Sequence, residues 1–195
     1  YLITRFILII PAILLTGFSG CNRLGVSVGV PTGNALIVIA SDVHLSATAD
    51  KAMRLKAAIR SANNLAAKAF IISGDAVSRA TDPDRNFIAE LTEIGTAFSG
   101  DRFAIALGNH DYRKDNHSSS DEPLPEGRQQ DMESMWRDIG KTPPYQSFDV
   151  NDYTFILLNT YRGHNDGRFF DDDQLDWFEK TVESSPRVII IMHHP

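Results

Sequence analysis

The chain has 195 residues, of which 43% are hydrophobic, and its 25 acidic side chains outnumber its 19 basic ones. This length is enough for one sizeable core and argues against two. The balance is mildly acidic and no run of lysine or arginine occurs, so a nucleic-acid-binding surface is not indicated.

The first 21 residues have the order of an export signal, with Arg5, an apolar run from Phe6 to Leu15, and small residues before Cys21. The run is shorter than the roughly twenty apolar residues of a membrane span. Because Cys21 is the single cysteine, it forms no internal disulfide. The stretch "FSGC" resembles the lipobox of bacterial lipoproteins, apart from Phe18 at a position that is usually aliphatic. We therefore expect an exported protein that is anchored in the membrane through a lipidated Cys21.

Two alternatives stay open for this segment. It is either a buried core helix or strand, or an ordinary cleaved signal that leaves a free thiol on a periplasmic or otherwise extracytoplasmic protein. Residues 22–34 are rich in glycine and indicate a tether, and residues 35–195 indicate one folded domain.

The first half of this domain alternates buried apolar strands with helices. The expected elements are a strand at 35–42, a helix at 51–69, a strand at 70–75, a helix at 82–99 and a strand at 102–111. Continuous apolar strands joined by full-length helices predict a parallel sheet with helices packed on it.

The second half begins with a long polar loop at 112–128. It continues with a helix at 129–140, a hairpin of strands at 145–150 and 153–160, a helix at 170–185 and a last strand at 187–195. Leu175, Phe178 and Val182 are expected on one face of the helix at 170–185. Asp171–Asp173 are expected to cap its N-terminus, where negative charge is favourable, and a cation site is the alternative.

Each major strand ends in side chains that bind metals. They are Asp42, His44, Asp75, Asn109, His110, Asp111, His193 and His194. The carboxyl ends of parallel strands meet at one edge of a sheet, so these side chains should meet there. Each group alone is ordinary turn or strand-end chemistry, but their joint order predicts a metal site. A mixed set of nitrogen and oxygen ligands suits Mn, Fe or Zn.

The motifs "DVH", "GD", "GNHD" and "HHP" resemble the calcineurin-like metallophosphoesterases over residues 37–195. The resemblance implies an α/β fold, a two-sheet β sandwich flanked by helices. The family pattern continues with a G-H-x-H block that does not occur before Pro195. We therefore expect a C-terminally incomplete domain, and poor or no hydrolysis by this 195-residue chain.

The resemblance also implies a role for each strand-end residue. Asp42 and His44 would bind a first metal ion, and Asp75 would bridge to a second, which Asn109 and one terminal histidine would bind. The family pattern places that ligand at His193. His194 would then point the other way, because adjacent side chains of an extended segment face opposite sides.

His110 would face the phosphoryl oxygens, and Asp111 would orient a neighbouring histidine. The implied reaction is hydrolysis of phosphate mono- or diesters by two metal ions with a bridging hydroxide. Ser78 stands where purple acid phosphatases have a tyrosine, and Asp111 where protein Ser/Thr phosphatases favour glutamate. The chain therefore most resembles the bacterial phosphodiesterase branch.

Two other hypotheses stay open. One is a non-catalytic metal-binding or partner-binding module on the same fold. The other is a fragment of the enzyme that does not fold stably alone.

Overall fold

A computed structural model gives the structure of residues 35–78, 85–112, 127–160 and 170–194. The predicted export signal and tether at 1–34, with Cys21, lie outside the described residues, as does most of the predicted loop at 112–128. In the part of the chain that is described, no helix has the length and apolar character needed to cross a membrane.

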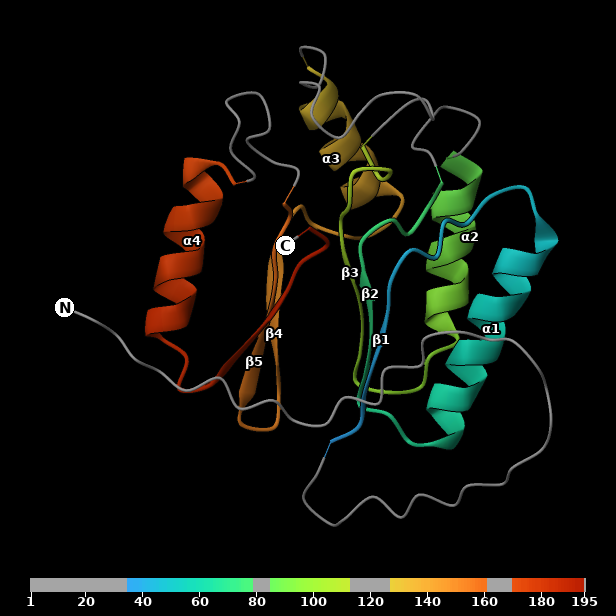
Figure 1. Ribbon diagram of the computed structural model, residues 1–195, viewed down its shortest axis with the longest axis horizontal. Helices are drawn as coiled ribbons and strands as arrows, with labels where there is room; N and C mark the ends of the chain where they lie inside the picture. Colours follow the sequence, from blue (N-terminus) through green and yellow to red (C-terminus); the bar gives the residue numbers. More distant parts are fainter. Residues whose placement is uncertain (1–34, 79–84, 113–126, 161–169, 195) are drawn as a thin grey trace.

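Two three-stranded sheets form the centre of the molecule (Figure 1). The first contains β1 (Ile37–Ala40), β2 (Ala69–Ser73) and β3 (Arg102–Ala106), all parallel and in this order. The second contains β4 (Gln146–Val150), β5 (Tyr153–Leu157) and β6 (Val188–Ile191). Its β4 and β5 form the predicted antiparallel hairpin, and β6 lies parallel to β5.

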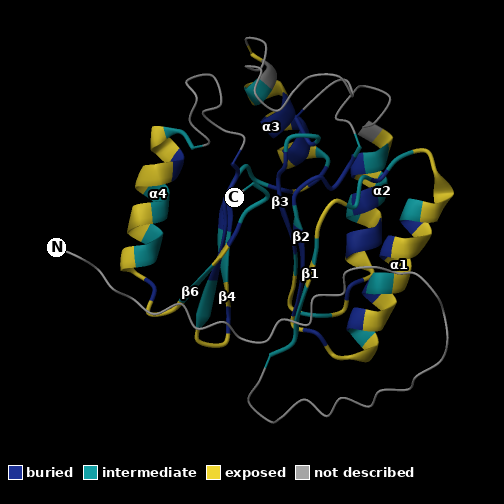
Figure 2. Cartoon of the chain, in the orientation of Figure 1, coloured by how far each residue is buried: buried dark blue, intermediate teal, exposed yellow. Residues whose placement is uncertain are grey.

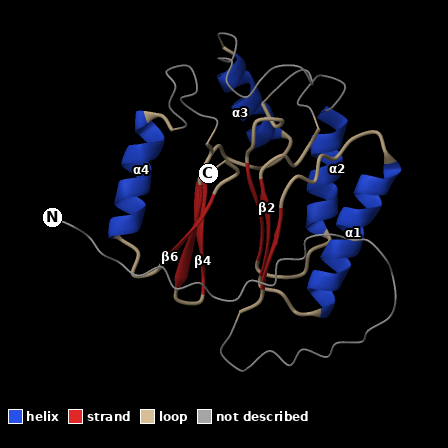
Figure 3. Ribbon diagram, in the orientation of Figure 1, coloured by secondary structure: helices blue, strands red, loops and turns tan. Residues whose placement is uncertain are grey.

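Within the described ranges, four helices flank the two sheets (Figure 3). The outer face of the first sheet is covered by α1 (Ala49–Asn64) and α2 (Arg85–Thr96), and α4 (Asp172–Glu183) lies outside the second sheet. The remaining helix, α3 (Arg128–Asp138), lies near the carboxyl ends of the parallel strands (Figure 1). The predicted α/β sandwich flanked by helices is confirmed, with helix and strand ends a few residues from those expected.

The central strand β2 explains why its sequence is apolar without alternation. Phe70 and Ile72 join the core beneath the helices, whereas Ala69 and Ile71 join the core between the two sheets. All four side chains are 0% exposed. Figure 2 shows this burial as dark blue along the inner strands. A strand that is buried on both faces needs apolar residues at every position.

The outer helix α4 differs in part from the prediction. Leu175 is 42% exposed, and the buried residue of this helix is Gln174. The side chain of Gln174 accepts a hydrogen bond from the backbone N–H of Asn159 and donates one to its carbonyl, at 2.8 and 3.0 Å. The predicted acidic cap is confirmed, because the Asp171 carboxylate accepts the N–H of Gln174 at 2.9 Å.

We expect Ile71→Ala to lower the free energy of unfolding by about 2–5 kcal/mol, because it opens a cavity between two sheets. Leu175→Ala removes a similar volume from an exposed site, and its effect should stay within about 0.5 kcal/mol. Urea denaturation of the two variants measures the difference. Equal losses would show that the inter-sheet core is not the main source of stability at Ile71.

Candidate metal centre

The segments that follow β1 and β2 run side by side as a short parallel ladder. The backbone N–H of Asp42 donates to the carbonyl of Gly74 at 3.2 Å, and the N–H of His44 donates to the carbonyl of Asp75 at 2.8 Å. Leu45 continues the ladder through a bridge with Val77. This pairing places the side chains of the "DVH" and "GD" motifs next to each other.

The carboxylate of Asp75 lies at the centre of the site and is 5% exposed. Its Oδ1 accepts the backbone N–H of His110 at 3.0 Å. Its Oδ2 lies near the Nε2 atoms of three imidazoles, at 3.3 Å from His193, 3.7 Å from His44 and 4.0 Å from His110. One buried carboxylate therefore contacts groups from three different strand ends.

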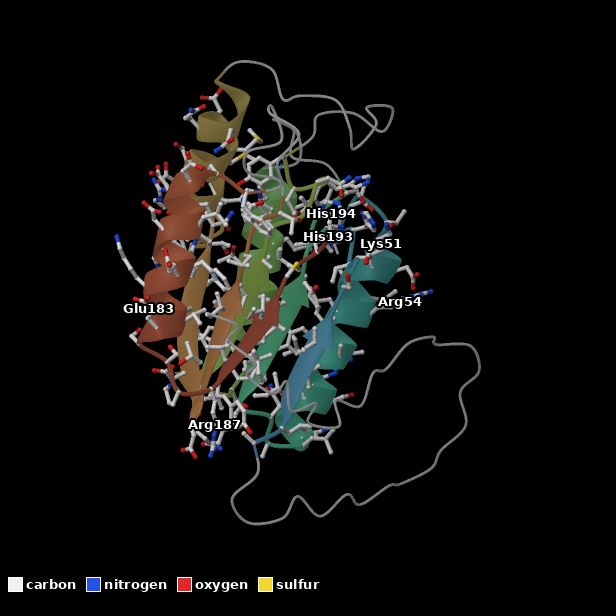
Figure 4. All side chains as sticks on the ribbon, turned by 60° about the vertical axis from the view of Figure 1, so that its left-hand side comes forward. Lys51, Arg54, Glu183, Arg187, His193 and His194 are labelled. Carbon is white, nitrogen blue, oxygen red and sulfur yellow. The ribbon has the colours of Figure 1, made fainter. Side chains whose placement is uncertain are left out.

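The last strand brings His193 to the same place. Figure 4 shows His193 and His194 at the end of β6 opposite to Arg187. The Nδ1 of His193 lies 3.0 Å from the carbonyl oxygen of Ser73, which can only accept, so Nδ1 carries a proton. In the neutral ring this leaves the lone pair on Nε2, toward Asp75, as a metal ligand requires.

The charges of Asp75 and His193 are coupled, because each group shifts the pKa of the other. The hydrogen bond to Asp75 raises the pKa of His193 to about 9, against the effect of burial. Burial alone would raise the pKa of Asp75, but the hydrogen bonds from His193 and from the backbone of His110 outweigh it and hold that pKa below its ordinary value. A cation bound here would replace the shared proton.

The two remaining imidazoles lie edge to face, with ring centroids 4.7 Å apart. Burial lowers the pKa of His44, which favours the neutral ring that binds a metal, while Asp75 opposes this shift. The Nδ1 of His110 lies 2.9 Å from the carbonyl oxygen of Ser78, so its Nε2 is also directed into the site.

Asn109 and His194 lie beside this group. The Oδ1 of Asn109 is 3.1 Å from the Nε2 of His194, and the ring of His194 is 4.6 Å from that of His193. His193 contacts Asp75, whereas His194 contacts Asn109 and Thr160. The two adjacent histidines thus have different partners, but their rings contact each other and do not point in opposite directions as expected. The reason is that β6 ends at Ile191 and the chain bends at His193.

Asp111 is 0% exposed, and its carboxylate accepts three backbone N–H groups, from Gly108, Ala76 and Val77, at 2.8–3.3 Å. Burial raises its pKa to about 7, although these hydrogen bonds favour the charged form. The expected contact with a histidine ring is not among these three bonds. Asp111 instead ties the loop after β3 to the loop after β2.

The acidic and histidine side chains form two groups that could each hold one cation. One consists of Asp42, Asp75 and His193, and the other of His44, Asp75 and His110, with the ligand atoms of each within 4.8 Å of one another. Asp75 belongs to both groups. The second group contains His110, which was expected to face the substrate. Its Nε2 lies 4.0 Å from Oδ2 of Asp75, so His110 is close enough either to bind a cation or to face a substrate.

Two glycines leave the space that such a centre needs. A Cβ on Gly74 would lie 2.3 Å from the ring of His193, and a Cβ on Gly108 would lie 2.4 Å from Oδ1 of Asp75. Real Cβ atoms do not approach so closely, so both positions must lack a side chain. The shared carboxylate, the oriented imidazoles and this close approach of the backbone fit a pair of divalent cations.

Sequence reasoning missed the hydroxyl residues that support the site. Ser41 donates to the carboxylate of Asp42 at 2.5 Å, Ser78 donates to the carbonyl of His44 at 2.7 Å, and Thr160 lies 2.7 Å from Nδ1 of His194. Their one sequence signal is their place at or just after strand ends, beside the motif residues. Serine and threonine are too common there for this signal to distinguish them.

Comparison with known proteins agrees with this geometry. Residues 35–195 match the family model of the calcineurin-like phosphoesterases. Among solved structures, a dimetal phosphatase from Danio rerio shares 16% identity with a TM-score of 0.53, over 82% of this chain and 69% of that one. A purple acid phosphatase from yellow lupin (Lupinus luteus) seeds shares 14% identity with a TM-score of 0.49, over 79% of this chain and 29% of that one. No curated protein matches the sequence significantly.

The chain belongs to the calcineurin-like phosphoesterase family, because the family model covers most of its length. This family membership places it among the metal-dependent phosphoester hydrolases and implies two metal ions and a phosphate-ester substrate. The likeness to the dimetal phosphatase from Danio rerio, at 16% identity, confirms the fold alone.

We expect Gly74→Ala to abolish tight metal binding, because the new methyl group would displace the ring of His193. Gly127→Ala is the matched control, since Gly74 and Gly127 have similar positive φ angles of 84° and 75°, but no described atom lies within 4 Å of a Cβ at Gly127. Both variants carry the backbone cost of about 1–2 kcal/mol for a side chain at positive φ. Titration calorimetry with Mn²⁺ compares them, and equal affinities would contradict the crowding at Gly74.

Proposed function

We propose that this protein hydrolyses phosphodiesters at a dinuclear metal centre built around Asp75. The observation that carries the proposal is the shared carboxylate. Oδ2 of Asp75 lies within 4.0 Å of three imidazole nitrogens, and the residue is common to both candidate metal groups. A carboxylate with two oxygens can bind two cations at once, which a single histidine cannot.

The proposed ligand sets follow from the family pattern, and they differ from the two groups above, which place Asp42 with His193 and His44 with His110. Asp42 and His44 are nonetheless close, with Oδ1 of Asp42 3.6 Å from Nε2 of His44. Asp42 and His44 would hold one ion, Asn109 and His193 the other, and Asp75 both. Two ions held in this way lower the pKa of a bound water and stabilise the attacking and leaving oxygens of an in-line displacement at phosphorus.

His110 is the residue proposed to act on the substrate. Its Nδ1 proton is donated to the carbonyl of Ser78, so the ring is fixed with Nε2 toward the site. When protonated, this nitrogen would neutralise charge on the phosphoryl oxygens and donate a proton to the leaving group. His110 is about one-third exposed, which leaves it accessible from solvent.

The preference for diesters rests on position 78 and on Asp111. The hydroxyl of Ser78 donates to the carbonyl of His44 and supplies no phenol ligand of the kind found in purple acid phosphatases. Asp111 is held by three backbone N–H groups that a longer glutamate would displace. Both features support the phosphodiesterase branch that the sequence favours.

Hydrolysis of bis(p-nitrophenyl) phosphate with Mn²⁺ tests this proposal in a chain extended by the family's G-H-x-H block, because poor or no hydrolysis is expected of residues 1–195 alone. We expect Asp75→Asn to abolish any hydrolysis and to lower the number of bound ions, because one of the two bridging oxygens becomes an amide NH₂. Asp101→Asn is the matched control, since Asp101 is exposed at the opposite end of β3 and pairs with Lys68. Turnover by Asp75→Asn equal to that of the control would refute the shared-carboxylate site.

The alternative is a non-catalytic metal-binding or partner-binding module on the same fold. The same assay separates it from the enzyme. In the extended chain, two bound Mn²⁺ ions without hydrolysis of either the diester or p-nitrophenyl phosphate would favour the module. Hydrolysis of the monoester alone would keep the enzyme and reject the preference for diesters.

We further propose that the protein is exported and anchored in a membrane through Cys21. The support is the order of charge, apolar run and small residues before the single cysteine. We expect Cys21→Ser to move the protein from the membrane fraction to the soluble fraction in a bacterial host. Mass spectrometry must show that the signal has been removed, and a cleaved Cys21→Ser variant that stays in the membrane would contradict the lipid anchor.

A further inference from the structure

We propose that Thr160 and His194 form a hydrogen-bond relay that orients the side-chain amide of Asn109, so that its oxygen is presented to the metal centre. This positioning role rests on the proposed function of that centre. It concerns His194, which contacts the proposed ligand Asn109, and Thr160, which contacts His194. Both are outside the proposed set of metal ligands.

The relay joins the segments that follow β5, β6 and β3. Thr160 is 1% exposed, and its Oγ1 lies 2.7 Å from Nδ1 of His194. The backbone N–H of His194 also donates to this Oγ1, at 3.4 Å. On the other side of the ring, Nε2 of His194 lies 3.1 Å from Oδ1 of Asn109. The imidazole thus fills the space between a buried hydroxyl and the amide.

The proposed relay has one direction of proton donation. Oγ1 of Thr160 accepts the N–H of His194 and, in the relay, donates its own proton to Nδ1. A neutral imidazole that accepts at Nδ1 carries its proton on Nε2. Nε2–H then donates to Oδ1 of Asn109, which is an acceptor. All the contacts along the relay are satisfied in this arrangement, and the tautomer of His194 distinguishes it from the reverse one, in which Nδ1–H donates to Oγ1 of Thr160.

The direction matters because the two ends of an asparagine amide have nearly the same shape and opposite chemistry. The oxygen binds a cation, whereas the NH₂ group has only donors to offer. If the amide of Asn109 turned over, its NH₂ would meet Nε2–H of His194, donor against donor. The relay therefore disfavours the turned amide, and the second lone pair of Oδ1 stays available for a cation.

Metal binding by the full chain tests the relay. In calorimetric titrations with Mn²⁺, Thr160→Val and His194→Ala should each weaken one of the two ions about 10–100-fold and leave the other unchanged. Thr160→Ser keeps the hydroxyl, and His194→Gln places a donor near the position of Nε2, so both should retain most of the affinity. His193→Ala, which removes a proposed ligand, should instead lose a whole ion.

Thr154→Val is the matched control, because Thr154 lies on β5 and its hydroxyl donates to Asp149, outside the relay, at 2.7 Å. Thermal unfolding of each variant shows whether the fold is kept. Unchanged affinity in both Thr160→Val and His194→Ala would overturn the relay, as would an equal loss of both ions. Loss of a whole ion in His194→Ala with retention in His193→Ala would make His194 the ligand and also overturn it.

A second measurement needs neither metal nor activity. Nitrogen-15 NMR of the metal-free chain reports the tautomer of His194, which should carry its proton on Nε2 in the wild type and lose this preference in Thr160→Val. A proton on Nδ1 in the wild type would overturn the relay. If the relay passes both tests but the chain extended by the family's G-H-x-H block binds Mn²⁺ and hydrolyses no phosphate ester, the proposed function fails and the relay stands.

Discussion

The burial of one carboxylate, Asp75, is the constraint on which the site depends. A charged group in the interior is costly unless it is paired and hydrogen-bonded, and the penalty is several kcal/mol per ion. Asp75 meets this demand with the backbone N–H of His110 and the imidazole of His193. The site is therefore organised before any cation arrives, with a protonated His193 balancing the charge that a metal would otherwise neutralise.

The backbone around Asp75 is held in an unfavourable conformation. Asp42, His44 and Asp75 have φ angles of 54°, 48° and 51°, a left-handed region that costs residues with a side chain about 1–2 kcal/mol each. Such a strained backbone conformation persists only where the surrounding structure holds the backbone in place. Here the ladder between the two loops and the carboxylate of Asp111 fix the backbone from both sides. Stability is thus given up to direct three side chains toward one point.

Much of this arrangement can be read from the sequence, because it follows from strand ends. The apolar run at β2 predicts a strand buried on both faces, and the polar residues after β1, β2 and β3 must then meet at one edge of that sheet. The position of His193 does not follow from this rule, because β6 belongs to the second sheet. What the sequence does not reveal is the partner of each polar group when that partner lies far along the chain. Gln174 is buried because it bonds the backbone of Asn159, and nothing in the helical pattern predicts this.

The same limit applies inside the site. The motifs identify Asp75 and His193, but the group that orients the His193 ring is the carbonyl of Ser73, two residues before Asp75. The carbonyl of Ser78, three residues after Asp75, orients the ring of His110. A backbone carbonyl has no residue type, so no pattern of letters can mark it.

One short loop, residues 73–78, therefore supplies the central carboxylate and the two carbonyls that orient its imidazoles. A shift of this loop would misplace all three together, which makes its attachment as important as its sequence. The attachment comes from Asp111, whose carboxylate binds the N–H groups of Ala76 and Val77 and whose carbonyl accepts the indole N–H of Trp136. Trp136 is fully buried in the core beneath the helices. That core is thus connected to the metal centre by hydrogen bonds in two steps, from Trp136 to Asp111 and from Asp111 to the loop at residues 73–78.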